Sequence, residues 1–308
     1  MEDNPIVSVC MITYNHENFI TKAIESVLEQ KATFSFELVI VNDNSSDKTD
    51  AIIISIINTH PNGKLIKYHK QVENIGMMEN FGFALNACAG KYIAICEGDD
   101  YWIDKNKLYN QVTFLEKNKD FYLVGYNAKY NKNGIETDSL VRKLSVEYMD
   151  FTTRHFIQKN PFVSSMVMFR NIGFKDVMSL FVNFSVGDWP LFTKLSLFGK
   201  SRFINKSVGY YRKHPNSVTN NNRLEYKAFK NELINRINHA KYWNDKLGSK
   251  FNKEVKEVIE YRSKILTTMA VRNFDMKTAI HYCKYVDLKT IKKTSSKLII
   301  KTLKALSF

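Results

Sequence analysis

The sequence is poor in the residues that mark specialised chains: of 308 residues, four are cysteine, five proline and twelve glycine. The four cysteines, Cys10, Cys88, Cys96 and Cys283, are scattered without a C-x-x-C pair. This spacing argues against a disulfide scaffold or a zinc site and favours reduced thiols in a reducing compartment. With 44% hydrophobic and 25% charged residues, the chain is neither collagen-like nor largely disordered. We therefore expect a globular protein.

Long apolar runs are also absent. No window reaches the ~20 uninterrupted apolar residues of a membrane-spanning helix, and the apolar stretch 51–57 ends at Asn58. The N-terminus is acidic, with Glu2 and Asp3 where a secretion signal would be basic. We expect a cytoplasmic protein without a segment that crosses the membrane.

Positive charge is concentrated toward the C-terminus. Residues 1–222 carry 25 Lys and Arg against 23 Asp and Glu, whereas residues 223–308 carry 20 against 8, so the net charges are +2 and +12. A basic region binds anions, and nucleic acid, an anionic membrane surface and a phosphorylated ligand all qualify. The pattern over 223–308 is helical, which predicts a helical region following a first domain over 1–222.

The last stretch, 288–308, mixes leucine and isoleucine with lysine. A helix of this composition could lie on an anionic membrane. Pairing with a second copy of the chain, as a homo-oligomer, is the alternative.

The first hundred residues alternate short β-branched apolar runs with helical spacing. Strands are predicted at 6–12, 36–41, 65–69 and 92–96, and helices at 17–29, 47–57 and 77–88. Further along we predict helices at 105–115 and 188–198 and strands at 122–130, 163–169 and 202–211. Such alternation predicts an α/β fold with a mostly parallel sheet, helices on both faces, and ligands at the carboxyl ends of the strands.

Polar residues follow the predicted strands and should share that rim: Thr13, Tyr14, Asn15, Asp43, Glu97, Asp99 and Asp100. Crowded carboxylates repel one another and bind Mg²⁺ or Mn²⁺ well. The alternative is an acidic turn that caps the helix starting near Lys105. Asp43 and Asn15 could bind a ribose or base, or could stabilise their own turns.

Two later motifs add candidates. Asp188, in Gly-Asp-Trp-Pro, could serve as a helix N-cap. Arg212 and His214 follow the last predicted strand, a position that favours a functional role, and Arg212 could offset phosphate charge. Two tryptophans directly follow the acidic sites and could stack on a sugar or pack in the core: Trp102 and Trp189.

Five segments taken together resemble the inverting, GT-A fold glycosyltransferases of family 2, above all bacterial members that assemble surface polysaccharide and lipopolysaccharide. The segments are VSVCMITYNHENFITKAIESVLEQ, FELVIVNDNSSDKT, ENIGMMENFGFALNACAGKYIAICEGDDYW, VGDWPLF and YYRKH. The resemblance covers about residues 5 to 215. It implies a Rossmann-like GT-A domain that transfers a sugar from a nucleotide-sugar donor, such as a UDP-sugar, to a hydroxyl of a saccharide or lipid-linked acceptor. It also implies a divalent metal, Mn²⁺ or Mg²⁺.

By the same resemblance each candidate acquires a role. The nucleotide site would comprise Thr13, Tyr14, Asn15, Asp43, Asn74, Gly76 and Asp99. The metal would be held by Asp99, Asp100 and His214, and the general base would be Asp188. Candidates for diphosphate or sugar contacts are Glu97, where many relatives carry Asp, and Trp102, Trp189 and Arg212.

Other classes of protein fit less well. A dinucleotide-dependent dehydrogenase needs G-x-G-x-x-G after the first strand, where this chain has TYNHEN. No nucleic-acid-binding signature accompanies the C-terminal lysines, so we expect no nucleic-acid partner. The remaining alternative is a basic membrane- or nucleic-acid-binding protein with a non-catalytic nucleotide-sugar fold. A lipid-linked acceptor favours peripheral attachment to the inner face of the cytoplasmic membrane.

Overall fold

The computed structural model describes residues 4–181, 184, 186–215, 225–287 and 300. The chain divides into two units, one comprising 1–156 and 160–214 and the other 157–159 and 215–308. The domain boundary predicted at residue 222 lies outside the described residues.

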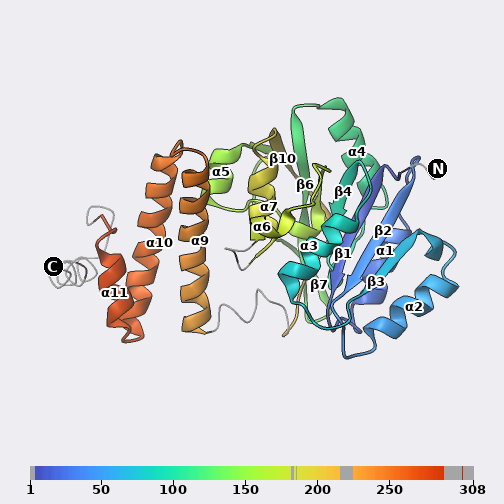
Figure 1. Ribbon diagram of the computed structural model, residues 1–308, viewed down its shortest axis with the longest axis horizontal. Coiled ribbons are helices and arrows are strands. Elements are labelled where there is room, and N and C mark those ends of the chain that lie inside the picture. The colour runs from blue at the N-terminus through green and yellow to red at the C-terminus, as the bar shows by residue number, and fades with distance from the viewer. Residues whose placement is uncertain (1–3, 182–183, 185, 216–224, 288–299, 301–308) are drawn as a thin grey trace. The chain divides into compact units, whose positions relative to one another are not determined.

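The first unit contains one ten-stranded sheet (Figure 1). Its strands are β1 (Val7–Thr13), β2 (Phe36–Asn42), β3 (Ile66–Lys70), β4 (Tyr92–Ile95), β5 (Tyr101–Trp102), β6 (Phe121–Lys132), β7 (Ile135–Leu140), β8 (Tyr148–Phe151), β9 (Val167–Arg170) and β10 (Lys200–Lys213). The helices up to residue 214 are α1 (Ile20–Leu28), α2 (Thr49–Thr59), α3 (Met77–Ala87), α4 (Lys107–Lys117), α5 (Thr153–Gln158), α6 (Val177–Phe181) and α7 (Asp188–Leu195).

The strands are ordered β3-β2-β1-β4-β9-β6-β10-β5, with β7 beside β6 and β8 beside β10. Strands β1 to β4 are parallel, as predicted. Beyond β4 the sheet is mixed, because β9 runs antiparallel to both of its neighbours. The predicted α/β class is confirmed, and the carboxyl ends of β1, β2 and β4 meet at one edge.

Alternate residues of the central strands face opposite layers, as a sheet buried on both sides requires. In β2, Leu38 and Ile40 pack with α1, α2 and α4, whereas Val39 and Val41 pack with α3, α6 and α7. The near-continuous apolar runs of the sequence follow from this double burial.

The segment 131–148, in which no residue-level role can be assigned from the sequence, contains the turn and second strand of a β-hairpin. Asn133 and Gly134 have φ angles of 50° and 88° and connect β6 to β7. Positive φ at two successive residues matches a type I′ turn, for which Asn-Gly is the preferred pair.

The second unit contains the predicted helices: α9 (Tyr226–Lys246), α10 (Asn252–Arg272) and α11 (Met276–Cys283). Leu233 and Ile237 of α9 pack on Leu266 of α10. Among the described residues, no helix combines the length and apolar character needed to traverse a bilayer. The predicted membrane-surface helix at 288–308 lies, apart from Ile300, outside the described residues.

Candidate active site

The turn that follows β4 brings three carboxylates to the carboxyl edge of the sheet. Asp100 N–H donates to the Glu97 carbonyl (3.0 Å) and closes the turn, while Gly98 N–H donates to the Ile12 carbonyl (3.1 Å) at the end of β1. A Cβ atom at Gly98 would lie 2.9 Å from atoms of Thr13 and His16. Glycine is therefore what allows the acidic turn to pack against β1.

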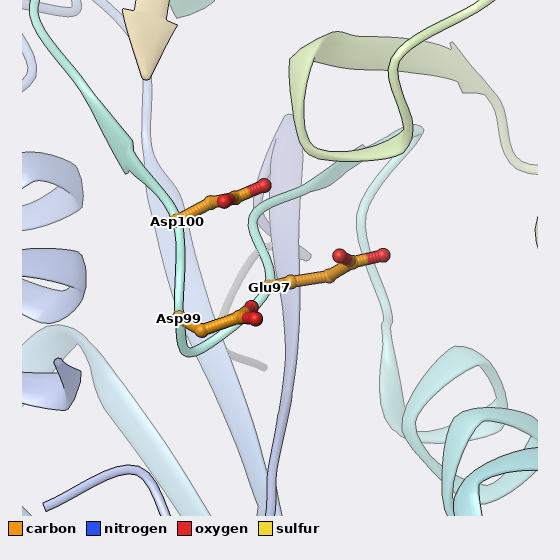
Figure 2. A group of neighbouring side chains, drawn as sticks. All are labelled: Glu97, Asp99 and Asp100. Carbon is orange, nitrogen blue, oxygen red and sulfur yellow. The ribbon is translucent and has the colours of Figure 1, made fainter. Parts of the chain in front are cut away.

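Figure 2 shows the side chains of Glu97, Asp99 and Asp100 projecting to the same side of this turn. One oxygen of each lies within 4.8 Å of the others, a spacing that suits a divalent cation. Asp100 has no exposed surface. Its Oδ1 accepts a hydrogen bond from Arg212 N–H (2.8 Å), and its buried Oδ2 accepts none from the described residues.

Burial and mutual repulsion disfavour the charged forms of two of these acids. Burial, followed by the charge of Asp99, raises the pKa of Asp100 well above its ordinary value. Burial also raises the pKa of Glu97, with the charges of Asp100, Asp99 and Asp188 adding to the effect. A bound cation would stabilise the charged forms of both acids and so oppose the rise in their pKa values.

Asp99 differs because two histidines face it. Burial raises its pKa, but the hydrogen bond with His214 and the charge of His16 outweigh burial, and the net pKa is lowered. His214 Nε2 lies 3.2 Å from Asp99 Oδ2, and its ring packs on Phe19 with centroids 4.4 Å apart. The predicted pair of Asp99 and His214 is thus brought together.

Arg212 provides a buried cation beside the acidic turn. Its Nη1 donates to the Asp99 carbonyl (2.8 Å), and its guanidinium carbon lies 4.4 Å from the centre of the Tyr101 ring. The guanidinium therefore stabilises the backbone of the turn as well as contributing positive charge near it.

Apart from Asp99 in the acidic turn, the predicted nucleotide residues lie at the end of β1 and on the loops after β1, β2 and β3. The two carboxylate oxygens of Asp43 accept the N–H groups of Ile75 (2.8 Å) and Gly76 (3.0 Å). Asn74 Oδ1 also accepts from Gly76 N–H (3.2 Å), and Gly76 is the N-cap residue of α3 with a φ of 88°. Asp43 and Asn74 thus fix the loop at the start of α3.

The loop after β1 is held in a similar way. Asn15, with a φ of 54°, accepts from Ser46 N–H (2.9 Å) through Oδ1. Thr13 is buried, with Oγ1 3.2 Å from His16 Nδ1. Tyr14 is 45% exposed. Among these three, Tyr14 has the side chain most available to a ligand.

Both tryptophans adopt the core role that the sequence left open. Trp102 is buried and donates from Nε1 to the Ser165 carbonyl (2.7 Å), with Lys107 Nζ 3.7 Å from its ring centre. Trp189 is buried and donates to the Phe156 carbonyl (2.6 Å). Each ring nitrogen is therefore paired inside the core.

Asp188 begins α7, and Gly187 rather than Asp188 occupies the N-cap position. Oδ2 accepts hydrogen bonds from Asn160 Nδ2 (2.7 Å) and Ser164 Oγ (2.9 Å), and Oδ1 accepts the N–H of Trp189 (2.7 Å). Burial raises the pKa of Asp188, although these donors oppose the effect. Ser165, the neighbour of Ser164, accepts the N–H of Glu97 at Oγ (3.3 Å), so adjacent serines connect Asp188 to the acidic turn.

Sequence reasoning missed several residues that support the site. The sequence shows no ligand spacing at His16, yet its ring centre lies 6.3 Å from that of His214. Ser164 falls within the strand predicted at 163–169, where the chain instead forms a 3-10 turn at Ser164–Met166 before β9. Asn160 lies just before that strand, where no element was predicted. No local pattern links these residues to Asp188, which is 24 and 28 positions away.

Residues 8–178 match the family described as glycosyl transferase family 2. The chain belongs to this family. The match spans the strands and loops that carry the acidic turn, and it confirms the resemblance inferred from the five segments.

Two curated relatives illustrate the range of similarity. An uncharacterised protein of Mycobacterium tuberculosis is 30% identical over 218 residues, which cover 69% of this chain and 60% of that protein. WfaP of Escherichia coli, named as a UDP-Glc:α-D-GlcNAc-diphosphoundecaprenol β-1,3-glucosyltransferase, is 27% identical over 70% of this chain and 80% of its own length.

Solved structures share the fold. TarS of S. aureus (residues 1–349), in complex with UDP-GlcNAc, aligns with a TM-score of 0.58 at 16% identity, covering 98% of this chain and 88% of that one. The mannosyltransferase PcManGT of Pyrobaculum calidifontis, in complex with GDP-Man and Mn²⁺, aligns with a TM-score of 0.55 at 16% identity, covering 99% and 81%. At this identity the likeness establishes the GT-A fold alone.

Proposed function

We propose that the protein is an inverting glycosyltransferase that moves a sugar from a UDP-sugar to a hydroxyl of a saccharide or lipid-linked acceptor during surface polysaccharide synthesis. The single observation that carries the proposal is that two adjacent serines join Asp188 to the acidic turn: Ser164 Oγ donates to Asp188 Oδ2 (2.9 Å), and Ser165 Oγ accepts the N–H of Glu97 (3.3 Å). A proton acceptor and an acidic cation-binding group in one site are the two parts that such a transfer needs. The name of WfaP favours UDP-glucose as the first donor to test.

The residues of the turn suit a divalent cation. Hard oxygen donors match Mg²⁺ or Mn²⁺, and the unpartnered Asp100 Oδ2 is an available ligand atom. Asp99, Asp100 and Glu97 would hold the ion, with His214 beside Asp99. When bound, the ion would supply positive charge to stabilise the departing nucleoside diphosphate.

Asp188 would act as the general base. The acceptor hydroxyl passes its proton to the carboxylate while its oxygen bonds to the anomeric carbon on the face opposite the nucleotide. The bond from that carbon to the diphosphate oxygen breaks, and its electron pair leaves with the diphosphate. One displacement of this kind inverts the anomeric centre.

The test is sugar transfer by the purified protein from UDP-glucose or UDP-GlcNAc, with Mn²⁺, to a polyprenyl-diphosphate-linked GlcNAc, followed by mass spectrometry. Asp188→Asn should lower kcat by about 10² to 10⁴-fold while leaving UDP binding intact, because it removes only the proton acceptor. Asp176→Asn is the matched control, since Asp176 is an exposed carboxylate that also accepts from a serine, Ser179. Ordinary turnover by Asp188→Asn would remove this residue from the mechanism.

We further propose that the protein works at the inner face of the cytoplasmic membrane, where a lipid-linked acceptor would be presented. The +12 charge of residues 223–308 and the lysine-rich stretch 288–308 support this. Deleting that stretch would also remove Ile300, which is buried in a cluster of the second unit with Val286 and Ala279.

A substitution variant is therefore the cleaner test of membrane attachment. It changes to glutamine the lysines of this stretch: Lys289, Lys292, Lys293, Lys297, Lys301 and Lys304. The unchanged protein should float with vesicles that contain phosphatidylglycerol, and much less of the variant should do so. Equal flotation of both proteins would refute attachment through this stretch.

A further inference from the structure

Both lone pairs of one oxygen of Asp188 are already in use. A carboxylate oxygen offers two lone-pair sites. Oδ2 accepts from Asn160 Nδ2 at 2.7 Å and from Ser164 Oγ at 2.9 Å. Oδ1 accepts only the N–H of Trp189, at 2.7 Å, among the described residues. One lone pair of Oδ1 is therefore available to a substrate hydroxyl.

The two donors are themselves held in place. Asn160 Oδ1 accepts the N–H of Phe162 (3.0 Å), which turns its Nδ2 toward Asp188. Arg142 Nη2 donates to the carbonyls of Asn160 (3.2 Å) and Phe162 (2.8 Å) and so anchors the backbone that carries the amide. Ser164 begins the 3-10 turn Ser164–Met166, whose regular backbone fixes its position.

The geometry points to Asn160 and Ser164 as positioning residues for the general base: by filling Oδ2 they orient the carboxylate and leave Oδ1 as the atom that receives the proton of the acceptor hydroxyl. This inference rests on the proposed function, because it assumes that Asp188 is the base. Neither residue needs to touch the substrate, and each acts through Asp188.

The same two hydrogen bonds stabilise the charged carboxylate. Of the charged side chains in the described part of the chain, Arg142 favours the ionised form of Asp188, and Glu97 interacts with it as a like charge. Burial raises the pKa of Asp188, and Ser164 and Asn160 act in the opposite direction. Loss of either donor should therefore raise the pKa further, so that more of the base is protonated at neutral pH.

A direct test measures the ionisation of Asp188 by NMR of the full-length protein labelled with ¹³C at aspartate Cγ, in EDTA. The Asp188 signal is assigned by its loss in Asp188→Asn. Ser164→Ala and Asn160→Ala should each raise the pKa by about one unit, whereas Ser164→Thr, which keeps the hydroxyl, should retain the native value. Ser179→Ala is the matched control, because Ser179 donates to Asp176 over the same 2.9 Å at an exposed site.

Turnover provides the second readout. With UDP-glucose, Mn²⁺ and polyprenyl-diphosphate-linked GlcNAc, the acidic limb of the kcat/KM profile should shift to higher pH by the same amount, and kcat should fall about 10-fold or more with little change in donor KM. A purely structural role would lower the amount of folded protein without moving the pKa. Thermal melting of each variant separates these effects. If Asn160→Ala does not fold, the comparison of Ser164→Ala with Ser164→Thr tests the positioning role on its own.

The outcomes also separate this inference from the proposed function. If Asp188→Asn is inactive while Ser164→Ala and Asn160→Ala keep the native Asp188 pKa and pH profile, the positioning role is wrong and the base assignment stands. If Asp188→Asn retains ordinary turnover, the base assignment itself is wrong.

Discussion

The unpartnered oxygen of Asp100 predicts a substitution that stabilises the fold and removes metal binding. The side chain is fully buried, Oδ1 accepts from Arg212 N–H, and Oδ2 accepts from none of the described residues. Ionisation of Asp100 is opposed by burial and by the charge of Asp99, and an incompletely hydrogen-bonded buried group costs about 1 to 3 kcal/mol, more when it is charged. Asp100→Asn keeps an oxygen for Arg212 N–H and removes the negative charge beside Asp99. In EDTA and at a pH where Asp100 is ionised, the free energy of unfolding of the variant should exceed that of the unchanged protein by about 1 to 3 kcal/mol.

The sign of the pH dependence follows from the raised pKa of Asp100. A buried acid with a raised pKa destabilises the fold when it ionises, so in EDTA the stability contribution of Asp100 should be lost as pH rises from about 4 through the folded-state pKa. Asp100→Asn should reduce this loss. Mn²⁺ should restore stability to the unchanged protein and have little effect on the variant, because a ligand of the ion is missing.

Urea unfolding at several pH values, with EDTA and with Mn²⁺, measures all three effects. Asp176→Asn, at an exposed carboxylate, controls for the loss of one charge. If Asp100→Asn lowers stability in EDTA, or if Mn²⁺ stabilises it as strongly as the unchanged protein, the assignment of Asp100 as a strained metal ligand is refuted.

Two further predictions concern residues that support the turn. Gly98→Ala places a Cβ 2.9 Å from atoms of Thr13 and His16. Urea unfolding should show a loss of about 1 to 3 kcal/mol, and an unchanged free energy of unfolding would contradict the packing argument. Burial lowers the pKa of Lys107 to about 7, so stability should rise between pH 7 and about 10 and fall again with acidification. Lys107→Met should abolish this rise; the same slope in both proteins would mean that another group titrates there.

Much of the first unit was predictable because its layers impose strong patterns. The strands and helices predicted in the first hundred residues lie within three residues of their observed bounds, since double burial makes β1, β2 and β4 apolar and short. Strand β7 was missed because its residues are largely polar and exposed, although Asn133-Gly134 marked the turn. The antiparallel orientation of β9 depends on pairing with strands that are distant in sequence, which local hydrophobic periodicity does not indicate.

The candidate site could also be predicted only in part. Asp43, Asp99 and Asp100 could be placed on one rim because each directly follows a predicted strand. The two hydrogen-bond donors to Asp188 could not be predicted, because Asn160 and Ser164 come close to it only in the folded chain. The burial of Trp102 could not be predicted either, because a tryptophan near acidic residues can stack on a sugar as well as pack in the core. The hydrogen bond from its ring to the Ser165 carbonyl favours the core role.

The most direct test of the central claim is calorimetric titration of UDP into the full-length protein and into Asp100→Ala, each with Mn²⁺ and with EDTA. The account predicts binding to the unchanged protein that depends on Mn²⁺ and is lost in Asp100→Ala. Absence of UDP binding under every condition, or equal binding by both proteins in EDTA, would contradict a metal-assisted UDP-sugar site at the acidic turn.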